Sequence, residues 1–149
     1  GNLMKLNVNI DSNLTENAVY IDAIEMSSDI NCLIKYVQSI DATKVLNGKL
    51  GDHIYRVNLA EVYRVFTENK VVKMETETKK FVLNKRLYEI EAIINHHFIK
   101  ISKSEIINTH YLDHLSMTAT GQIKIFFKND IVTYSSRRYL KSIKERLEL

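Results

Sequence analysis

The first stretch of this chain whose residue types could do chemistry is Ser102-Lys103-Ser104, a lysine between two hydroxyl residues. It separates two apolar runs within residues 98–108, so it is expected to form a crest that points outward from a buried strand pair. One cation and two hydroxyl donors suit phosphate oxygens and the edges of nucleic-acid bases. Taken alone, such a crest is more often an ordinary polar hairpin tip.

A second polar and basic stretch strengthens the case. It runs through Ser136, Arg137, Arg138 and Lys141, after a predicted strand over 131–135. Ser136 is expected to cap the last helix, which places both arginines in its first turn, where the helix dipole already favours anions. Inward-facing positions are predicted at Leu140, Ile143 and Leu147. Arg137, Lys141 and Lys144 recur as one basic stripe, a pattern that is usually just a solvated face.

These stretches also carry a family resemblance. The segments NKRLYEIEAII (84–94), FIKISKSEIIN (98–108) and SSRRYLKSIK (135–144) occur in that order. This order resembles the LytTR DNA-binding domain of bacterial transcription regulators, over roughly residues 51–147. The turn Asn129-Asp130 departs from the Asn-Gly that family members often have there.

The resemblance implies an α+β, mainly antiparallel β domain that reads DNA through loop tips on one edge. The residues that it assigns to DNA lie on three such tips and beside the last: Asn69 and Lys70; Ser102, Lys103 and Ser104; Ser136, Arg137, Arg138 and Lys141. Lys103 and Arg138 are the two that it would assign to base readout. The implied function is sequence-specific binding of double-stranded DNA at direct repeats by a cytoplasmic bacterial transcription regulator, with two copies, or a homodimer, on each site. No reaction, cofactor, metal or small-molecule substrate is implied.

Charge is distributed unevenly along the 149 residues. Residues 1–50 carry four lysines and six acidic residues, a net −2, while residues 51–149 carry seventeen basic and twelve acidic residues, a net +5. The basic excess therefore lies entirely in the part that resembles LytTR, the sign expected for a polyanionic partner. A hydrophobic content of 45% is enough for one well-buried core.

Residues 1–50 are predicted to form a β-β-α extension that precedes the domain at 51–149. Strict alternation predicts strands over 5–10 and 18–24, paired as a hairpin, and helical spacing predicts a helix over 28–40. Cys32 falls on the apolar face of that helix and is expected in the core. Asn47-Gly48 is a two-residue hairpin signal. The extension is too short for the phosphorylation receiver that LytTR regulators, as response regulators, often carry.

The rest of the chain is predicted to contain a series of strands and one further helix. That helix is expected to begin at a cap residue, Asn84, and to place Leu87, Ile90, Ile93 and Ile94 on one face. A turn is expected over 67–70. The predicted strands are 53–57, 61–66, 71–75, 79–83, 112–117, 122–127 and 131–135.

Two other interpretations remain open, docking and RNA binding, and a third, a metal site, is disfavoured. A metal site has only the His110/His114 spacing in its favour, with no cluster of further ligands. The acidic extension could instead make the chain a protein-interaction module that docks on a membrane protein which restrains it. Eight tyrosines could stack on single-stranded RNA, although most fall at apolar positions. A single cysteine fits a reducing cytoplasm, and no apolar run is long enough to span a membrane.

Overall fold

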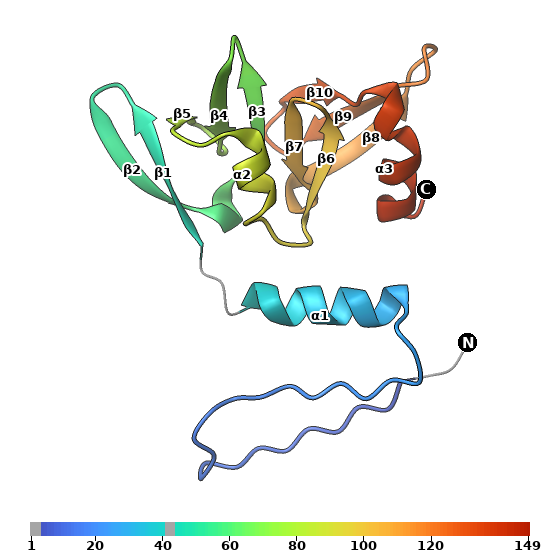
Figure 1. Ribbon diagram of the computed structural model, residues 1–149. Coiled ribbons are helices and arrows are strands. Elements are labelled where there is room, and N and C mark those ends of the chain that lie inside the picture. Colours follow the sequence, from blue (N-terminus) through green and yellow to red (C-terminus); the bar gives the residue numbers. More distant parts are fainter. Residues whose placement is uncertain (1–3, 41–43) are drawn as a thin grey trace.

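The computed structural model describes residues 4–40 and 44–149, and Figure 1 shows how their elements are arranged. A seven-stranded sheet has the order β2-β1-β5-β4-β3-β7-β6, and a three-stranded sheet has the order β10-β9-β8. Every strand pair in both sheets is antiparallel. The fold class predicted from the sequence, α+β and mainly antiparallel β, is confirmed.

The elements of the large sheet are β1 (Val45–Leu50), β2 (His53–Asn58), β3 (Arg64–Glu68), β4 (Val71–Glu75), β5 (Lys80–Leu83), β6 (Phe98–Ser102) and β7 (Glu105–Asn108). Those of the small sheet are β8 (Leu112–Met117), β9 (Ile123–Phe127) and β10 (Val132–Tyr134). The helices are α1 (Ser28–Ile40), α2 (Leu87–Glu91) and α3 (Leu140–Leu147), with the 3-10 turns η1 (Leu59–Glu61), η2 (Thr109–Tyr111) and η3 (Arg137–Tyr139).

Two apolar clusters stabilise the domain, and β7 contributes to both because successive side chains of a strand point to opposite faces. Ile106 belongs to the first cluster, with residues of β1–β5 and the buried Ile90 of α2. Ile107 belongs to the second, which joins β6, β9 and the buried Ile143 of α3. Leu87, Ile93 and Ile94 pack against the first cluster, and Leu140 and Leu147 against the second, as their spacing predicted.

Gly48 lies in the middle of β1 rather than in a turn, so the Asn47-Gly48 hairpin prediction is wrong. The hairpin turns at Gly51, whose φ of +62° suits glycine. A Cβ atom on Gly48 would stand 2.6 Å from the Cβ of Phe81 and 2.8 Å from the Cε of Met74. The glycine is needed because these two side chains pack directly against the strand, which the local sequence does not reveal.

The strands predicted over 5–10 and 18–24 do not form, so the hairpin prediction for the first residues is wrong. Figure 1 shows residues 4–27 as two extended runs without strand arrows, on the far side of α1 from the sheets. All ten of their large apolar side chains are exposed, among them Leu6 at 85% and Ile10 at 90%. The alternating sequence gives each of these runs an apolar face. An isolated pair of strands is only marginally stable when no surface covers that face.

Helix α1 forms over the predicted residues, but its apolar face is only partly covered. Ile30, Ile34 and Val37 are half-buried, while Leu33 is 38% and Ile40 63% exposed. Cys32 is exposed, so its predicted place in the core is wrong. Residues 4–40 and 44–50 thus comprise two exposed extended runs, a helix, and a strand, β1, that pairs within the large sheet with β2 and β5. Within the described residues, no helix is long and apolar enough to cross a membrane.

Several boundaries differ from those predicted. The strand expected over 61–66 begins at Arg64, because the side chain of Asn58 caps the η1 turn before it. Helix α2 begins at Leu87 rather than after Asn84, and the backbone N–H of Arg86 donates to the Glu89 carboxylate at 3.0 Å. The strands predicted over 71–75 and 112–117 have the expected bounds.

Candidate nucleic-acid interface

Three polar tips that are far apart in the sequence lie at one end of the domain. They are the β3–β4 turn, the crest between β6 and β7, and the η3 turn that leads into α3, all at the upper end of the sheets in Figure 1. The backbone N–H of Thr67 donates to the Ser104 carbonyl at 2.8 Å, and that of Ser136 donates to the Ile101 carbonyl at 2.8 Å. These two bonds fix the first and third tips to the crest on either side.

The β3–β4 tip is a tight hairpin turn over Asn69 and Lys70, shorter than the turn predicted over 67–70. Both residues have positive φ, 52° and 65°, the conformation of a type I′ turn that matches the twist of the flanking strands. Both side chains are exposed, and Lys70 therefore points its ammonium group into solvent. The adjacent Glu68 is paired with Lys73, at 2.9 Å between Oε1 and Nζ.

The crest between β6 and β7 is ordered by its own serines. The Ser104 N–H donates to Oγ of Ser102 at 3.2 Å, and the two Oγ atoms are 3.4 Å apart. These bonds leave Lys103 as the outermost residue, exposed between two residues that hold the turn. The serines therefore shape the crest as well as offering hydroxyl groups on its surface.

The third tip differs in one respect from the prediction. Ser136 is the cap, since its Oγ accepts from the Arg138 N–H at 3.3 Å, but Arg137 and Arg138 form the 3-10 turn η3 and α3 begins only at Leu140. Both arginine side chains are exposed. Their position beside the crest follows from the Ser136–Ile101 bond rather than from a long helix.

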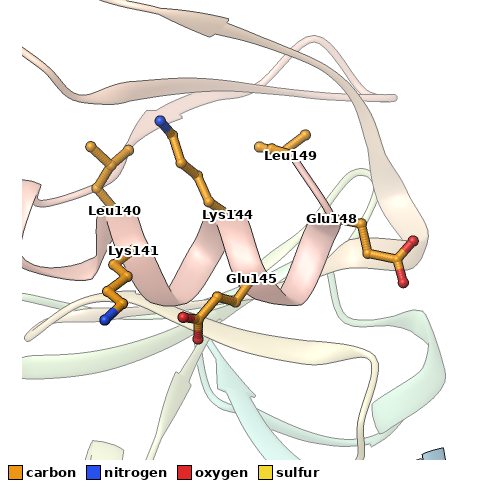
Figure 2. A pocket seen from close by; sticks show the side chains of 6 residues that line it. All are labelled: Leu140, Lys141, Lys144, Glu145, Glu148 and Leu149. Carbon is orange, nitrogen blue, oxygen red and sulfur yellow. The ribbon is translucent and has the colours of Figure 1, made fainter. Parts of the chain in front are cut away.

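The basic stripe predicted along the last helix is not continuous. In Figure 2 the ammonium groups of Lys141 and Lys144 point to different sides of α3, and the Glu145 carboxylate lies on the side of Lys141. Arg137 stands in η3, outside the α-helix. Lys141 is thus the one lysine of α3 next to the third tip, and Lys144 lies a turn further away.

A buried ionic network lies directly behind the crest. Nε of Arg64 is 2.7 Å from the Glu75 carboxylate, and Nη1 is 3.3 Å from the Glu105 carboxylate, with side-chain exposures of 15%, 8% and 11%. Glu105 also accepts from Thr133 Oγ1 at 2.7 Å. The network joins β3, β4, β7 and β10, so it ties both sheets to the residue that follows the crest.

Burial and ion pairing both shift the pKa values in this network. Desolvation raises the pKa of Glu105, although the hydrogen bond from Thr133 and the charge of Arg64 act in the opposite direction. The pKa of Arg64 is raised because hydrogen bonds and charge interactions with Glu75 and Glu105 outweigh its own desolvation. Sequence reasoning missed this network, because its members are 11 and 41 residues apart and nothing local links them.

The basic side chains of the three tips are electrostatically unopposed. Within residues 4–40 and 44–149, no carboxylate lies within ion-pair distance of Lys70, Lys103, Arg137 or Arg138. Exposed cations without partners keep their charge available for an incoming anion. The edge therefore offers four exposed cations that have no carboxylate partner among the described residues.

A fourth tip, between β8 and β9, also reaches this edge and was not predicted as part of the site. The Cδ atom of Arg137 is 3.9 Å from the position that a Cβ on Gly121 would take. Thr118 and Thr120 share a hydrogen bond in this tip, at 3.0 Å between their Oγ1 atoms. The polar run before Gly121 is the signal that the sequence offers for this tip.

The histidines do not assemble a metal centre in the described part of the chain, where no group of three or more His, Cys, Asp or Glu residues has suitable geometry. His96, His97 and His110 are near one another. The ring centroids of His96 and His97 are 4.0 Å apart, and those of His97 and His110 are 6.3 Å apart. His114 instead stacks on Phe126 at 4.1 Å. The His110/His114 spacing therefore does not produce a pair.

Comparison with known proteins agrees with this architecture. The family model of the LytTr DNA-binding domain matches residues 52–148. Relatives from Staphylococcus aureus, described as uncharacterized HTH-type transcriptional regulators, are 42% identical in strain NCTC 8325 and 40% identical in the bovine strain RF122. Both matches cover 99% of this chain and 100% of the relative. A solved LytTr DNA-binding domain from Bacillus cereus superposes with a TM-score of 0.69 at 17% identity, over 72% of this chain and all of that one.

The fold and the polar edge together define a β-rich domain with basic loop tips, and the matches identify its family. The chain belongs to the LytTR DNA-binding domain family. The term HTH in the names of the relatives does not describe this fold: in the described residues, strands separate each of the three α-helices from the next. A helix-turn-helix requires two successive helices.

Proposed function

We propose that this protein is a bacterial transcription regulator that binds double-stranded DNA sequence-specifically through the three tips. Lys103 and Arg138 would read bases, Arg137, Lys70 and Lys141 would contact phosphates, and the flanking Ser102, Ser104, Ser136 and Asn69 would add hydrogen bonds. The observation that carries the proposal is the clustering of unopposed cations on one edge of a domain in the LytTR family. Phosphate contacts supply most of the affinity in such complexes, while base contacts supply the specificity.

The position of the three tips at one end of the sheets supports this mode of binding. Side chains on separate tips can enter successive grooves along one face of the duplex, with no helix lying in the major groove. Arginine can offer its guanidinium as a bidentate fork to guanine, which contributes about 1–3 kcal/mol of discrimination. We further propose that two copies occupy direct repeats upstream of a regulated gene, in the cytoplasm, and that no reaction is catalysed.

The first test is the salt dependence of binding to DNA from the region upstream of the protein's own gene. If about five phosphates are neutralised, the logarithm of the binding constant should fall against log salt with a slope of about −4 to −5. Fluorescence anisotropy over a salt series measures this slope. A flat response, or a preference for single strands over duplex, would contradict the proposal and favour the RNA-binding alternative.

The docking alternative assigns the important surface to residues 1–50 instead. Its supporting observation is the exposed apolar surface of the extended runs and α1. The two interpretations are separated by measuring DNA binding of the chain with and without residues 4–40. If the shortened chain retains its sequence preference for a single site, the tips account for binding.

A further inference from the structure

The extended run over residues 5–10 is self-complementary when it is paired with itself in antiparallel register. If residues whose numbers sum to 16 face each other, Lys5 faces Asp11, Leu6 faces Ile10, and Val8 faces its own copy on the two-fold axis. Asn7 then faces Asn9. Opposite charges, apolar pairs and amide pairs thus all coincide in a single register. Cross-strand pairs of these kinds each contribute about 0.2–1 kcal/mol relative to alanine pairs.

We propose that this run is a self-association arm, in which residues 5–10 of two copies pair as antiparallel strands about a two-fold axis at Val8. The partner is a second copy of this chain, and the interface is isologous, as two-fold symmetry requires. This inference goes beyond the proposed function, because it concerns association of the chain in the absence of DNA.

The backbone of the arm is available for such pairing. Among described residues 4–26, a single hydrogen bond joins two backbone groups, from the Leu14 N–H to the Asp11 carbonyl at 3.2 Å. An extended segment with unpaired N–H and C=O groups is a template for another strand. The turn after Asp11, where the Asn13 N–H donates to the Asp11 carboxylate at 2.9 Å, ends the run at the last residue of the proposed register.

The side chains of the arm also require a partner. Leu6, Val8 and Ile10 are 85%, 73% and 90% exposed, and they alternate with Lys5, Asn7 and Asn9. One side of the paired strands would therefore be apolar and the other polar. Scattered exposed apolar residues are common in soluble proteins, but a strictly alternating apolar face indicates a surface that becomes covered.

Charge favours pairing through this run rather than through the second one. Lys5 and Asp11 stand at the two ends of the paired register, so two ion pairs form at the two ends of the proposed pairing. The second run, 18–24, has one charged residue, Asp22, and no lysine to face it. It can lie beside the first as an outer strand, which would extend the two-stranded pairing to the three or more strands that stable sheets need.

The test is sedimentation of the full chain without DNA over a concentration series. We expect a reversible dimer. Val8→Lys should abolish it by placing two like charges at the axis, whereas the matched control Asn9→Lys, on the polar face, should retain it. Lys5→Asp should weaken the dimer about tenfold or more by setting two acidic pairs face to face, and adding Asp11→Lys should restore it.

Cross-linking gives a second, independent readout. In a Cys32→Ser background, Val8→Cys should form an intermolecular cross-link with a short thiol reagent much faster than Asn7→Cys, because position 8 alone faces itself. A chain that stays monomeric at every concentration would overturn the proposal and leave the arm to a different partner. A dimer that tolerates Val8→Lys, or equal cross-linking at positions 7 and 8, would also overturn it. Since DNA is absent, none of these outcomes bears on the DNA-binding proposal.

Discussion

Arg64 is the residue on which the shape of the interface most depends. It forms ion pairs with two buried carboxylates, Glu75 and Glu105, and its guanidinium also lies over the ring of Phe66, 4.2 Å from the ring centroid. Removing one partner of a buried ionic network leaves uncompensated charge in a poorly solvated site. The crest is therefore supported by a residue that does not itself reach its surface.

We predict that Arg64→Met lowers the free energy of unfolding by about 3–5 kcal/mol. The buried Glu105 carboxylate loses its ion-pair partner, and Glu75 keeps only Lys80, whose Nζ is 3.9 Å from its carboxylate. Denaturant unfolding measures the change. The matched control is Lys73→Met, which breaks the more exposed pair with Glu68 and should cost less than about 1 kcal/mol. Comparable losses from both substitutions would contradict the role assigned to the network.

Glu105 gives the network a pH signature of defined sign. Burial raises its pKa above the ordinary value of 4.5, so between pH 4.5 and its pKa the folded protein holds a proton that the unfolded chain has released. Stability must therefore fall as pH rises through that window. Glu105→Gln, which cannot ionise, should remove this decline, and thermal melts of both proteins at a series of pH values measure it. A decline that persists in the variant would assign it to another group.

At the residue scale, sequence reasoning could find exposed site residues but not their buried supports. Lys103 and Arg138 stand out because polar or basic residues break apolar runs, and both are exposed on the edge. Whether they contact DNA stays a prediction. Glu105 lies in the segment EIIN as a polar residue at the end of a strand, and nothing in that segment predicts its burial beside Arg64.

At the scale of elements, the alternation of apolar and polar residues predicted strands well wherever the strands pair within a sheet. Strand β4 has the predicted bounds, and it pairs with β3 and β5. The same kind of alternation over 5–10 predicted a strand that does not form within one chain. The difference is physical: a pattern specifies which face a strand would bury, but the partner comes from the rest of the fold or from another molecule.

The β3–β4 turn allows stability and DNA binding to be separated. Lys70 has a φ of 65°, which is unfavourable for a side chain with a Cβ and free of strain for glycine. Lys70→Gly should therefore raise the free energy of unfolding by about 0.5–1 kcal/mol, measured by denaturant unfolding. The same variant should bind duplex DNA more weakly, with a salt slope smaller in magnitude by about 1. Unchanged binding would remove Lys70 from the interface.

On the scale of the whole molecule, the domain and the N-terminal segment that contains the arm have opposite charge. Residues 4–26 carry one lysine against four acidic residues, while residues 51–149 have a net charge of +5. This acidic segment is disfavoured next to the phosphate backbone, so self-association and DNA binding would use separate surfaces. If both proposals hold, linking two domains raises the effective concentration of the second at a paired site.

That coupling leads to a prediction for the full chain. Val8→Lys should weaken binding to DNA with two half-sites, because the second domain is no longer tethered to the first, while binding to one half-site stays unchanged. Anisotropy titrations with one-site and two-site duplexes measure both affinities. An equal loss on both DNAs would mean that the arm contacts DNA or supports the fold of the domain.

The most direct test of the central claim compares Arg138→Ala with Lys144→Ala on the specific site and on scrambled DNA. Arg138 lies on the third tip, and Lys144 lies a turn further along α3, exposed and equally charged. We predict that Arg138→Ala weakens the specific site by about ten- to a hundredfold and relaxes one base position, with little change in melting temperature. Lys144→Ala should cost little on either DNA. Equal losses from the two variants on both DNAs would contradict sequence readout through the tips, and a large fall in melting temperature for Arg138→Ala would make that arginine structural.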